Sequence, residues 1–331
     1  MSPDKTIILS SSITSVNGHV SIQTEFMKTR ACDLESSMQT DSVHGFVQDI
    51  HFEEVNVTFT SAYCPIIQRT IPLVISIMFG KSQYHYKAHF LVLLQSFAFH
   101  NLDEFLEGFP GMTCDFSDAE RVGFELAIRD HFMIPEFQPL PLEKIYRFCE
   151  VHFKRSLTRV RRNGAIVSPE KEMSFYVKAL ELLSPDHSNA SFHQLAKELQ
   201  REYPKIKKWL AWYLHPARGK FIFPALLSIP ANGSISKDTN AQESLGGVFQ
   251  RAAPKKNYQS PKCSTIQFGL CKTSKWTTSV LQGVCQYVIN PVRRGRSFSK
   301  MMVELRILQK SLLSQVKLME GHQVLAIKFL S

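Results

Sequence analysis

Met112-Thr-Cys-Asp-Phe-Ser-Asp-Ala-Glu-Arg-Val-Gly-Phe124 is the stretch on which the predicted fold depends. A short apolar run predicts a buried strand that ends at Cys114, and Asp115 follows it directly. Ser117 is a good helix N-cap residue, and apolar residues recur at helical spacing from there to Phe132. A carboxylate at the end of a central strand often presents a metal ligand or an acid/base group. Taken alone, however, this stretch favours a plainer interpretation, in which Asp115 caps a helix at an ordinary strand–helix turn.

Composition favours a globular protein with an anionic partner. The chain has 331 residues, of which 44% are hydrophobic, enough to bury the core of one large domain or two ordinary ones. Lys and Arg outnumber Asp and Glu by 39 to 29, which gives a net charge of +10. This excess favours a polyanion such as DNA as partner, although a basic protein without a nucleic-acid partner remains an alternative.

The cysteines and the hydropathy pattern predict an intracellular protein without a membrane segment. The seven cysteines are odd in number and irregular in spacing, unlike a disulfide framework. The N-terminal residues are polar and lack the apolar core of a signal peptide. The longest apolar run, around residues 71–79, is too short to cross a bilayer.

Periodicity predicts an α/β fold. The alternation of residues 52–60 predicts a first strand, and two further apolar runs complete an antiparallel meander. The other expected elements are strands at 64–69, 72–79, 111–115 and 145–149, and helices at 82–97 and from Ser117 to Phe132. A meander followed by alternating helices and strands predicts a mixed five-stranded sheet flanked by helices. RNase H-like domains share this order, which on topology alone is only an analogy.

Composition also divides the chain into segments. Residues 151–215 read as helices throughout, which predicts an all-helical insertion before the last core helix. The expected segments are a poorly ordered N-terminal arm at 1–45, an RNase H-like sheet core at 46–150, a helical insertion at 151–236, a closing helix of the core at 237–252, and a basic, weakly structured tail at 253–331 that carries one amphipathic helix at 303–319.

Two acids and one amide stand where an RNase H-like order requires metal ligands. Two-metal phosphoryl transfer in this arrangement needs carboxylates from the first strand, from the end of the fourth strand and from a late helix. Asp115 suits the second position and Glu243 the third. The first position falls on Asn56, whose neutral oxygen balances little cation charge. Glu54, two residues away on the same strand face, is an auxiliary candidate.

Five short motifs, in order over about residues 50–250, carry a resemblance to a known family. They are Asn56-Val-Thr-Phe59, Met78-Phe-Gly-Lys-Ser82, Cys114-Asp-Phe-Ser-Asp-Ala119, Cys149-Glu-Val-His152 and Asn240-Ala-Gln-Glu-Ser244. Together they resemble the catalytic core of Mutator-like element (MULE) transposases, with an Asp-x-Thr-Phe strand, an Asp-Phe-x-x-Ala acid, a Cys-x-x-His pair and a late Glu. The resemblance implies DNA cleavage and strand transfer with Mg²⁺ or Mn²⁺, and a nuclear location in a eukaryote.

The substitution at Asn56 leaves two functions open. A transposase-derived protein that lacks its first acid would be a degenerate copy with impaired cleavage. The alternative is a non-catalytic protein that binds nucleic acid or another protein on the same scaffold. The sequence also leaves open a homo-oligomer.

Two groups of residues around the predicted fifth strand are auxiliary candidates. Cys149 and His152 could form half of a zinc site or shape DNA contacts near the acids, and are equally consistent with a buried thiol and a hydrogen-bonded imidazole. A basic run follows them, consisting of Lys154, Arg155, Arg159, Arg161 and Arg162. These side chains could bind a phosphate backbone or simply form a solvated helix face.

Overall fold

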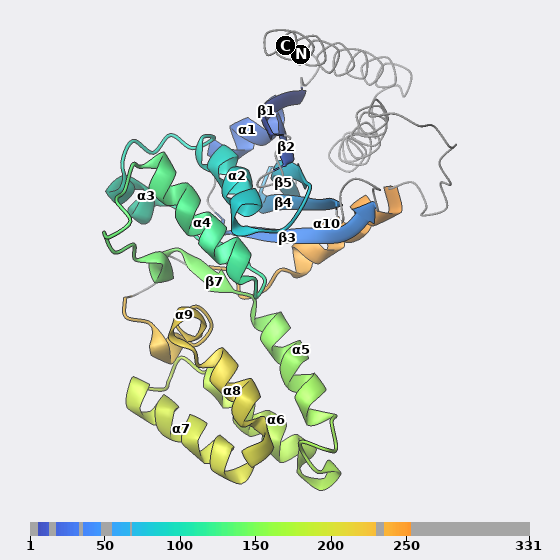
Figure 1. Ribbon diagram of the computed structural model, residues 1–331, viewed down its shortest axis with the longest axis vertical. Helices are drawn as coiled ribbons and strands as arrows, with labels where there is room; N and C mark the ends of the chain where they lie inside the picture. The colour runs from blue at the N-terminus through green and yellow to red at the C-terminus, as the bar shows by residue number, and fades with distance from the viewer. Residues whose placement is uncertain are drawn as a thin grey trace, which may run out of the picture.

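The computed structural model describes residues 6–12, 18–32, 36–47, 55–66, 68–229 and 235–252. Glu54, the tail from residue 253 and the amphipathic helix expected at 303–319 lie outside these ranges. Figure 1 shows a sheet with helices in the upper part of the molecule and a lobe made only of helices below it. Among the described helices, none combines the length and the apolar character needed to cross a membrane.

The described strands form one mixed seven-stranded sheet, which confirms the α/β class. The strands are β1 (Thr6–Ser12), β2 (His19–Thr24), β3 (Met38–Val47), β4 (Val55–Cys64), β5 (Arg69–Met78), β6 (Met112–Cys114) and β7 (Tyr146–Phe148). Their spatial order is β1-β2-β5-β4-β3-β6-β7. In this spatial order, every neighbouring pair between β1 and β3 is antiparallel. The remaining two pairs, β3 with β6 and β6 with β7, are parallel.

The meander begins one strand earlier than the sequence predicted. The expected first strand at 52–60 corresponds to β4, the middle strand of the meander. The expected strand at 64–69 is not a separate strand, because Cys64 ends β4, Arg69 begins β5, and the described residues between them form a turn. The true first strand of the meander, β3, begins in the segment 1–45, for which poor order was expected. That segment also supplies β1 and β2, so the sheet has seven strands instead of the five predicted.

Buried polar side chains explain why β3 gave no strand signal. Thr40 and Ser42 point to one face of β3, and their hydroxyls lie 2.8 Å and 2.6 Å from the hydroxyls of Thr60 and Thr58 on β4. Hydrogen bonds between these neighbours satisfy polar groups that would otherwise be costly to bury. The face that lies beneath a helix is therefore polar in sequence, and no alternation of apolar residues marks it.

Helices cover both faces of the sheet (Figure 1). The described helices of this part are α1 (Glu25–Cys32), α2 (Gln83–Leu94), α3 (Leu102–Gly108), α4 (Asp118–His131) and α10 (Asn240–Ala252). On one face the Tyr86 hydroxyl of α2 lies 3.3 Å from the Ser42 hydroxyl. On the other face Gln242 of α10 donates a 2.6 Å hydrogen bond to the Phe59 carbonyl of β4. α10 therefore lies on the face to which the odd-numbered residues of β3 point.

Gly123 brings α2 and α4 into direct contact. A Cβ atom at this position would lie 2.5 Å from the Cβ of Tyr86 and 2.8 Å from the Gln83 carbonyl. No side chain fits such a space, so glycine lets α4 lie close against α2. This contact holds α4, the helix that follows Asp115, against α2.

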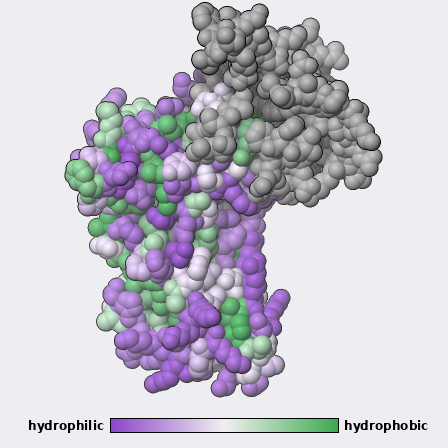
Figure 2. Space-filling view, viewed as in Figure 1, coloured by the Kyte–Doolittle hydropathy of each residue, from purple (hydrophilic) through white to green (hydrophobic). Residues whose placement is uncertain are grey.

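The lower lobe consists of the helices that follow β7. They are α5 (Glu150–Arg161), α6 (Glu172–Leu180), α7 (Asn189–Glu202), α8 (Lys207–Tyr213) and α9 (Pro216–Gly219). Short 3₁₀ helices of the lobe lie at Pro169–Lys171, Glu181–Leu183, Pro204–Ile206 and Pro224–Leu226, and another precedes β7 at Leu142–Lys144. Buried aromatic rings join the helices: Phe153 of α5 stacks on Trp209 of α8, with ring centroids 5.8 Å apart. The visible surface of this lobe is mostly hydrophilic (Figure 2).

Backbone hydrogen bonds hold the start of α5 against the sheet core. Cys149 N donates to the Cys114 carbonyl over 2.9 Å, which ties the start of α5 to the end of β6. Glu150 N donates to the Lys237 carbonyl over 2.8 Å, which ties α5 to the segment that leads into α10. The end of β6, the start of α5 and the start of α10 therefore meet at one place.

Candidate functional site

The first acid of the site is Asp41 on β3, which the sequence analysis missed. β3 and β6 are parallel, and Gln39 pairs with Thr113. Two residues farther along each strand stand Asp41 and Asp115, and adjacent strands lie about 4.8 Å apart. Asp41 accepts a 2.6 Å hydrogen bond from the backbone N–H of Ser42. The register therefore brings two carboxylates together at this edge of the strands.

Asp115 does not cap α4. The N-cap is Ser117, whose hydroxyl accepts a hydrogen bond from Glu120 N over 3.2 Å. Asp115 Oδ1 instead lies 3.1 Å from His152 Nδ1 and 3.5 Å from the Thr239 hydroxyl. The plainer interpretation of this stretch is therefore wrong, because the capping role belongs to Ser117 and the Asp115 carboxylate faces the site.

Glu243 lies in the first turn of α10 and carries the third carboxylate. Both of its oxygens accept hydrogen bonds from the Arg155 guanidinium of α5, one of them over 2.8 Å. Such a bidentate pair fixes the orientation of both side chains. The structure thus places Glu243 at the junction of the sheet and the helical lobe, as the neighbour of a basic residue that the sequence analysis had assigned to nucleic-acid contacts.

The three carboxylates influence one another electrostatically. Burial, together with the negative charges of Asp115 and Glu243, raises the pKa of Asp41 from 3.8 to about 7. Burial also raises the pKa of Asp115, with Glu243 adding to the rise while His152 opposes it. The hydrogen bonds from Arg155 lower the pKa of Glu243. Asp41, Asp115 and Glu243 therefore form one acidic site, which we call the acidic cluster.

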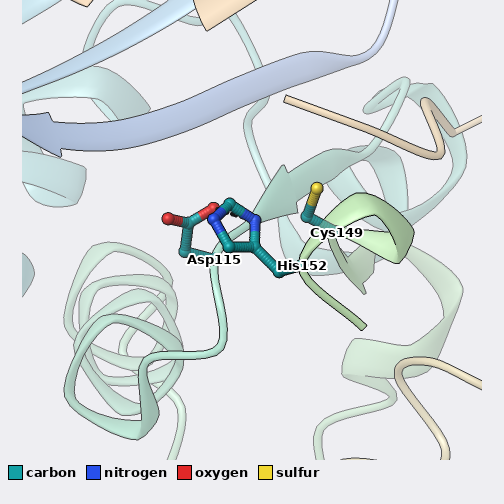
Figure 3. A group of neighbouring side chains, drawn as sticks. All are labelled: Asp115, Cys149 and His152. Atoms are coloured by element: carbon teal, nitrogen blue, oxygen red, sulfur yellow. Dashed lines mark ion pairs between the residues drawn. The ribbon is translucent and has the colours of Figure 1, made fainter. Parts of the chain in front are cut away.

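Cys149, His152 and Thr239 border the acidic cluster. A sulfur of Cys149, a ring nitrogen of His152 and a carboxylate oxygen of Asp115 all lie within 4.8 Å of one another. In Figure 3 the imidazole stands between the Asp115 carboxylate and the Cys149 side chain. The Thr239 hydroxyl lies 3.4 Å from Cys149 Sγ. The Cys-x-x-His pair thus lies beside an acid of the cluster, one of the placements that the sequence had left open.

The same contacts shift the pKa values of Cys149 and His152 in opposite directions. Burial acts to raise the pKa of the Cys149 thiol, but hydrogen bonds from His152 and Thr239 outweigh it, and the net pKa is lowered. The hydrogen bond with Cys149 raises the pKa of His152 against the effect of burial, and Asp115 adds to the rise. These directions favour a thiolate beside an imidazolium.

A fourth acid, Glu120, lies behind the cluster. It is buried in α4, and one of its carboxylate oxygens has no hydrogen-bond partner. Burial, together with the charges of Asp115 and Asp41, raises its pKa well above the usual value. A neutral carboxyl is the form that such a site favours, so Glu120 adds little negative charge to the cluster.

Asn56 does not stand in the position predicted for it. Phe59, not Asn56, pairs with Asp41, and Asn56 stands three residues before Phe59 in β4, roughly 10 Å away along the strand. Its side chain is fully buried, with Oδ1 lying 3.0 Å from His44 Nδ1 and Nδ2 donating to the Gly80 carbonyl over 3.3 Å. Asn56 is therefore a hydrogen-bonded residue inside β4, and the structure brings Asp41 rather than Asn56 beside Asp115.

The five basic residues of α5 and its C-cap, Arg162, do not share one role. Arg155 binds Glu243, Lys154 pairs with Glu150 over 3.2 Å, and the Arg161 guanidinium lies 4.5 Å from the centre of the Tyr176 ring. Arg159 and Arg162 are exposed and make no ion pair within the described ranges. These two arginines are the ones available to an anionic partner.

Sequence patterns carried some signal for the residues that were missed. Asp41 lies between Met38 and Val43 in a stretch rich in Thr and Ser, and an isolated Asp in such a strand could have been tested against the first-acid position. Thr239 precedes α10 directly, where a capping residue is expected. Its contacts with Asp115 and Cys149 depend on the tertiary structure alone.

No protein-family model matches the chain, and no curated protein matches it at a significant level, so the case for a function depends on the geometry described above.

Proposed function

We propose that this protein is an RNase H-like nuclease and strand transferase of the MULE transposase type, which acts on DNA with Mg²⁺ or Mn²⁺. The observation that carries the proposal is the acidic cluster, in which Asp115 and Glu243 add to the raised pKa of Asp41, and Glu243 adds to the raised pKa of Asp115. With Asp41 as the first acid, the reason to expect impaired cleavage disappears.

The topology supports the same proposal. Strands β5-β4-β3-β6-β7 form three antiparallel strands followed by two parallel ones, with β1 and β2 added at the β5 edge. The acids come from the middle strand β3, from the end of its parallel neighbour β6 and from the helix that follows the helical lobe. This is the order of acid-bearing elements that an RNase H-like fold uses for phosphoryl transfer.

The donor set fits hard divalent cations. Asp41, Asp115 and Glu243 would hold the ions, and carboxylate oxygens are the protein ligands that Mg²⁺ and Mn²⁺ prefer. When bound, two such ions supply charge stabilisation for the attacking and leaving oxygens of a phosphodiester. In the described structure Arg155 and His152 are the cationic groups that face these acids.

Exposed arginines near the end of α5 support DNA binding. Arg159 and Arg162 are exposed on the same helix that carries Arg155 toward Glu243. A phosphate backbone that followed this helix would reach the acidic cluster at its N-terminal end. Guanidinium groups bind phosphates in this manner without reading sequence.

The second candidate function is binding of nucleic acid without cleavage. The exposed arginines of α5 and the net charge of +10 favour it, and neither observation requires metal chemistry. DNA binding alone does not require the acidic cluster. The raised pKa of Asp41 means that this cluster costs stability at neutral pH, a cost that a metal-binding role would explain. We therefore rank this function second.

A plasmid-nicking assay on the full chain tests the first proposal. Purified protein with Mn²⁺ or Mg²⁺ is expected to convert supercoiled plasmid to the nicked form. Asp41→Asn, Asp115→Asn and Glu243→Gln should each lower the rate by at least about 100-fold, because each removes a metal-binding charge. Asp103→Asn, an exposed acid at the start of α3, is the matched control and should cleave like the wild type.

Two results would reject the cleavage proposal. One is a wild-type protein that binds DNA but does not nick it with either ion, which would select the second function. The other is an Asp41→Asn variant that nicks as fast as the wild type, which would remove Asp41 from the site.

A further inference from the structure

The Cys149 and His152 side chains and the Oδ1 side of Asp115 offer a set of donor atoms that differs from the rest of the acidic cluster. We propose that these three residues bind one borderline-soft divalent cation, Zn²⁺ by donor chemistry, at a site distinct from the one that hard cations would occupy. The site rests on these three residues and does not require that the protein cleave DNA.

Local structure brings the three donors together. Cys149 is the N-cap residue of α5 and His152 lies three residues later, in the first turn, so both side chains project from the same end of the helix. The hydrogen bond from Cys149 N to the Cys114 carbonyl holds this helix end against the residue that precedes Asp115. The donors therefore sit on a strand end and a helix start that the backbone locks to each other.

The nitrogen–oxygen distance suits a tetrahedral ion, and the sulfur lies close enough to reach the same ion after a small side-chain shift. His152 Nδ1 lies 3.1 Å from Asp115 Oδ1, and all three donor atoms lie within 4.8 Å of one another. Nitrogen and oxygen ligands at about 2.0–2.1 Å from a tetrahedral Zn²⁺ are about 3.3 Å apart. Despite its short distance, Nδ1 is buried without a hydrogen bond of acceptable geometry. These two atoms form an ion pair in the metal-free chain, and a cation held between them would take the place of that pair.

The chemistry of the donors selects the metal. A sulfur and an imidazole nitrogen are ligands that Zn²⁺ accepts readily, whereas Mg²⁺ requires oxygen ligands in an octahedron. A thiolate and a carboxylate together carry two negative charges, which balance one divalent cation inside a site where Cys149 is fully buried. This balance distinguishes the trio from the acidic cluster, which offers oxygen ligands alone.

Three protein ligands leave one tetrahedral position for another group. The Thr239 hydroxyl lies 3.4 Å from Cys149 Sγ and 3.5 Å from Asp115 Oδ1, beside the same space. Sites with three protein ligands commonly hold a water in the fourth position. Figure 3 shows one oxygen of Asp115 beside the imidazole and the other directed away from it, so this carboxylate can serve two cations at once.

Titration of the reduced, metal-free full chain with Co²⁺ tests the site. Cobalt(II) replaces zinc in such sites, and a thiolate ligand gives it a charge-transfer absorption in the near ultraviolet that nitrogen and oxygen ligands do not give. We expect this band at one equivalent of Co²⁺, its loss when Zn²⁺ is added, and its persistence when Mg²⁺ is added.

Variants assign the band to the residues. Cys149→Ser should abolish it, and His152→Asn should weaken Zn²⁺ affinity by at least about tenfold, since even changes around metal ligands have effects of that size. Cys64→Ser, a buried free cysteine at the end of β4, is the matched control and should keep the band. Circular dichroism of each variant verifies the fold.

The outcomes separate this proposal from the proposed function. Absence of the band in the wild type, or its persistence in Cys149→Ser, would overturn the zinc site whatever the nicking assay shows. Asp41→Asn and Glu243→Gln should keep the band because neither residue belongs to the trio. If the protein shows this band but does not nick DNA, the zinc site is supported and the nuclease function is rejected.

Discussion

Asp41 and Asp115 stand side by side on adjacent parallel strands, each two residues beyond the paired residues Gln39 and Thr113. Each is half-buried, and the charge of Asp115 contributes to the pKa of about 7 at Asp41. Two carboxylates in such a position repel each other at neutral pH unless a cation or a proton intervenes.

The pH dependence of the free energy of unfolding should reflect the protonation of Asp41. Its folded-state pKa of about 7 lies above the ordinary value of 3.8, so the folded chain holds this proton more tightly than the unfolded chain does. The resulting stability is complete below about pH 4 and is lost as the pH rises through 7. In the presence of a chelator, the free energy of unfolding of the wild type should fall between pH 5 and pH 8. In Asp41→Asn this fall should be smaller by roughly 1–3 kcal/mol.

Urea denaturation at the two pH values measures this difference. Asp103→Asn, which changes an exposed acid of α3, should show the same pH dependence as the wild type. An Asp41→Asn variant with an unchanged pH dependence would show that Asp41 is not protonated in the folded state at neutral pH.

Asn56→Asp should destabilise the protein and should not improve metal binding. Asn56 is fully buried, and its amide donates to the Gly80 carbonyl. A carboxylate there would lose that donor and place a charge beside a carbonyl oxygen, at a cost of roughly 1–3 kcal/mol. Denaturation and Mn²⁺ titration measure the two effects; a gain in Mn²⁺ affinity would restore Asn56 as the first-acid position.

Arg155→Gln should strengthen the binding of divalent cations. The Arg155 guanidinium occupies both oxygens of Glu243, and its hydrogen bonds lower the pKa of that residue. Both side chains are partly exposed, so removal of the pair should change stability by less than about 1 kcal/mol and raise Mn²⁺ affinity by up to about fivefold. Calorimetric titration measures the affinity.

Lys154→Gln is the matched control for this change. Lys154 precedes Arg155 on α5 and pairs with Glu150 rather than with Glu243. Its substitution should leave Mn²⁺ affinity unchanged. A lower affinity in Arg155→Gln than in the wild type would instead mean that Arg155 holds Glu243 in its binding position.

The exposed arginines of α5 should determine the salt dependence of DNA binding. Arg159→Gln and Arg162→Gln should each reduce the slope of log affinity against log salt concentration by about 1, if each side chain contacts one phosphate. Fluorescence anisotropy with duplex DNA over a salt series measures the slope. Lys197→Gln, at an exposed position of α7, should leave it unchanged; equal slopes for all of these proteins would place the DNA elsewhere.

The amino-acid sequence by itself determined the elements with strong local signals. The apolar run before Asp115 and the cap at Ser117 predicted β6 and α4, and the structure has both. Apolar spacing likewise predicted α2 and the helices after β7. Glu243 was found because a helix start is marked by local composition. These features depend on residues that are close in the chain.

Only the tertiary structure decided which acid stands beside Asp115. β3 carries polar residues on its covered face, where the hydroxyls of Thr40 and Ser42 form hydrogen bonds with hydroxyls of β4. A pattern of hydrophobic residues cannot reveal such a strand. The register of β3 against β6 joins residues about 70 positions apart, and that pairing replaced Asn56 with Asp41. The contact of Arg155 with Glu243 has the same origin. Long-range pairing is a property of the folded backbone, and no short motif encodes it.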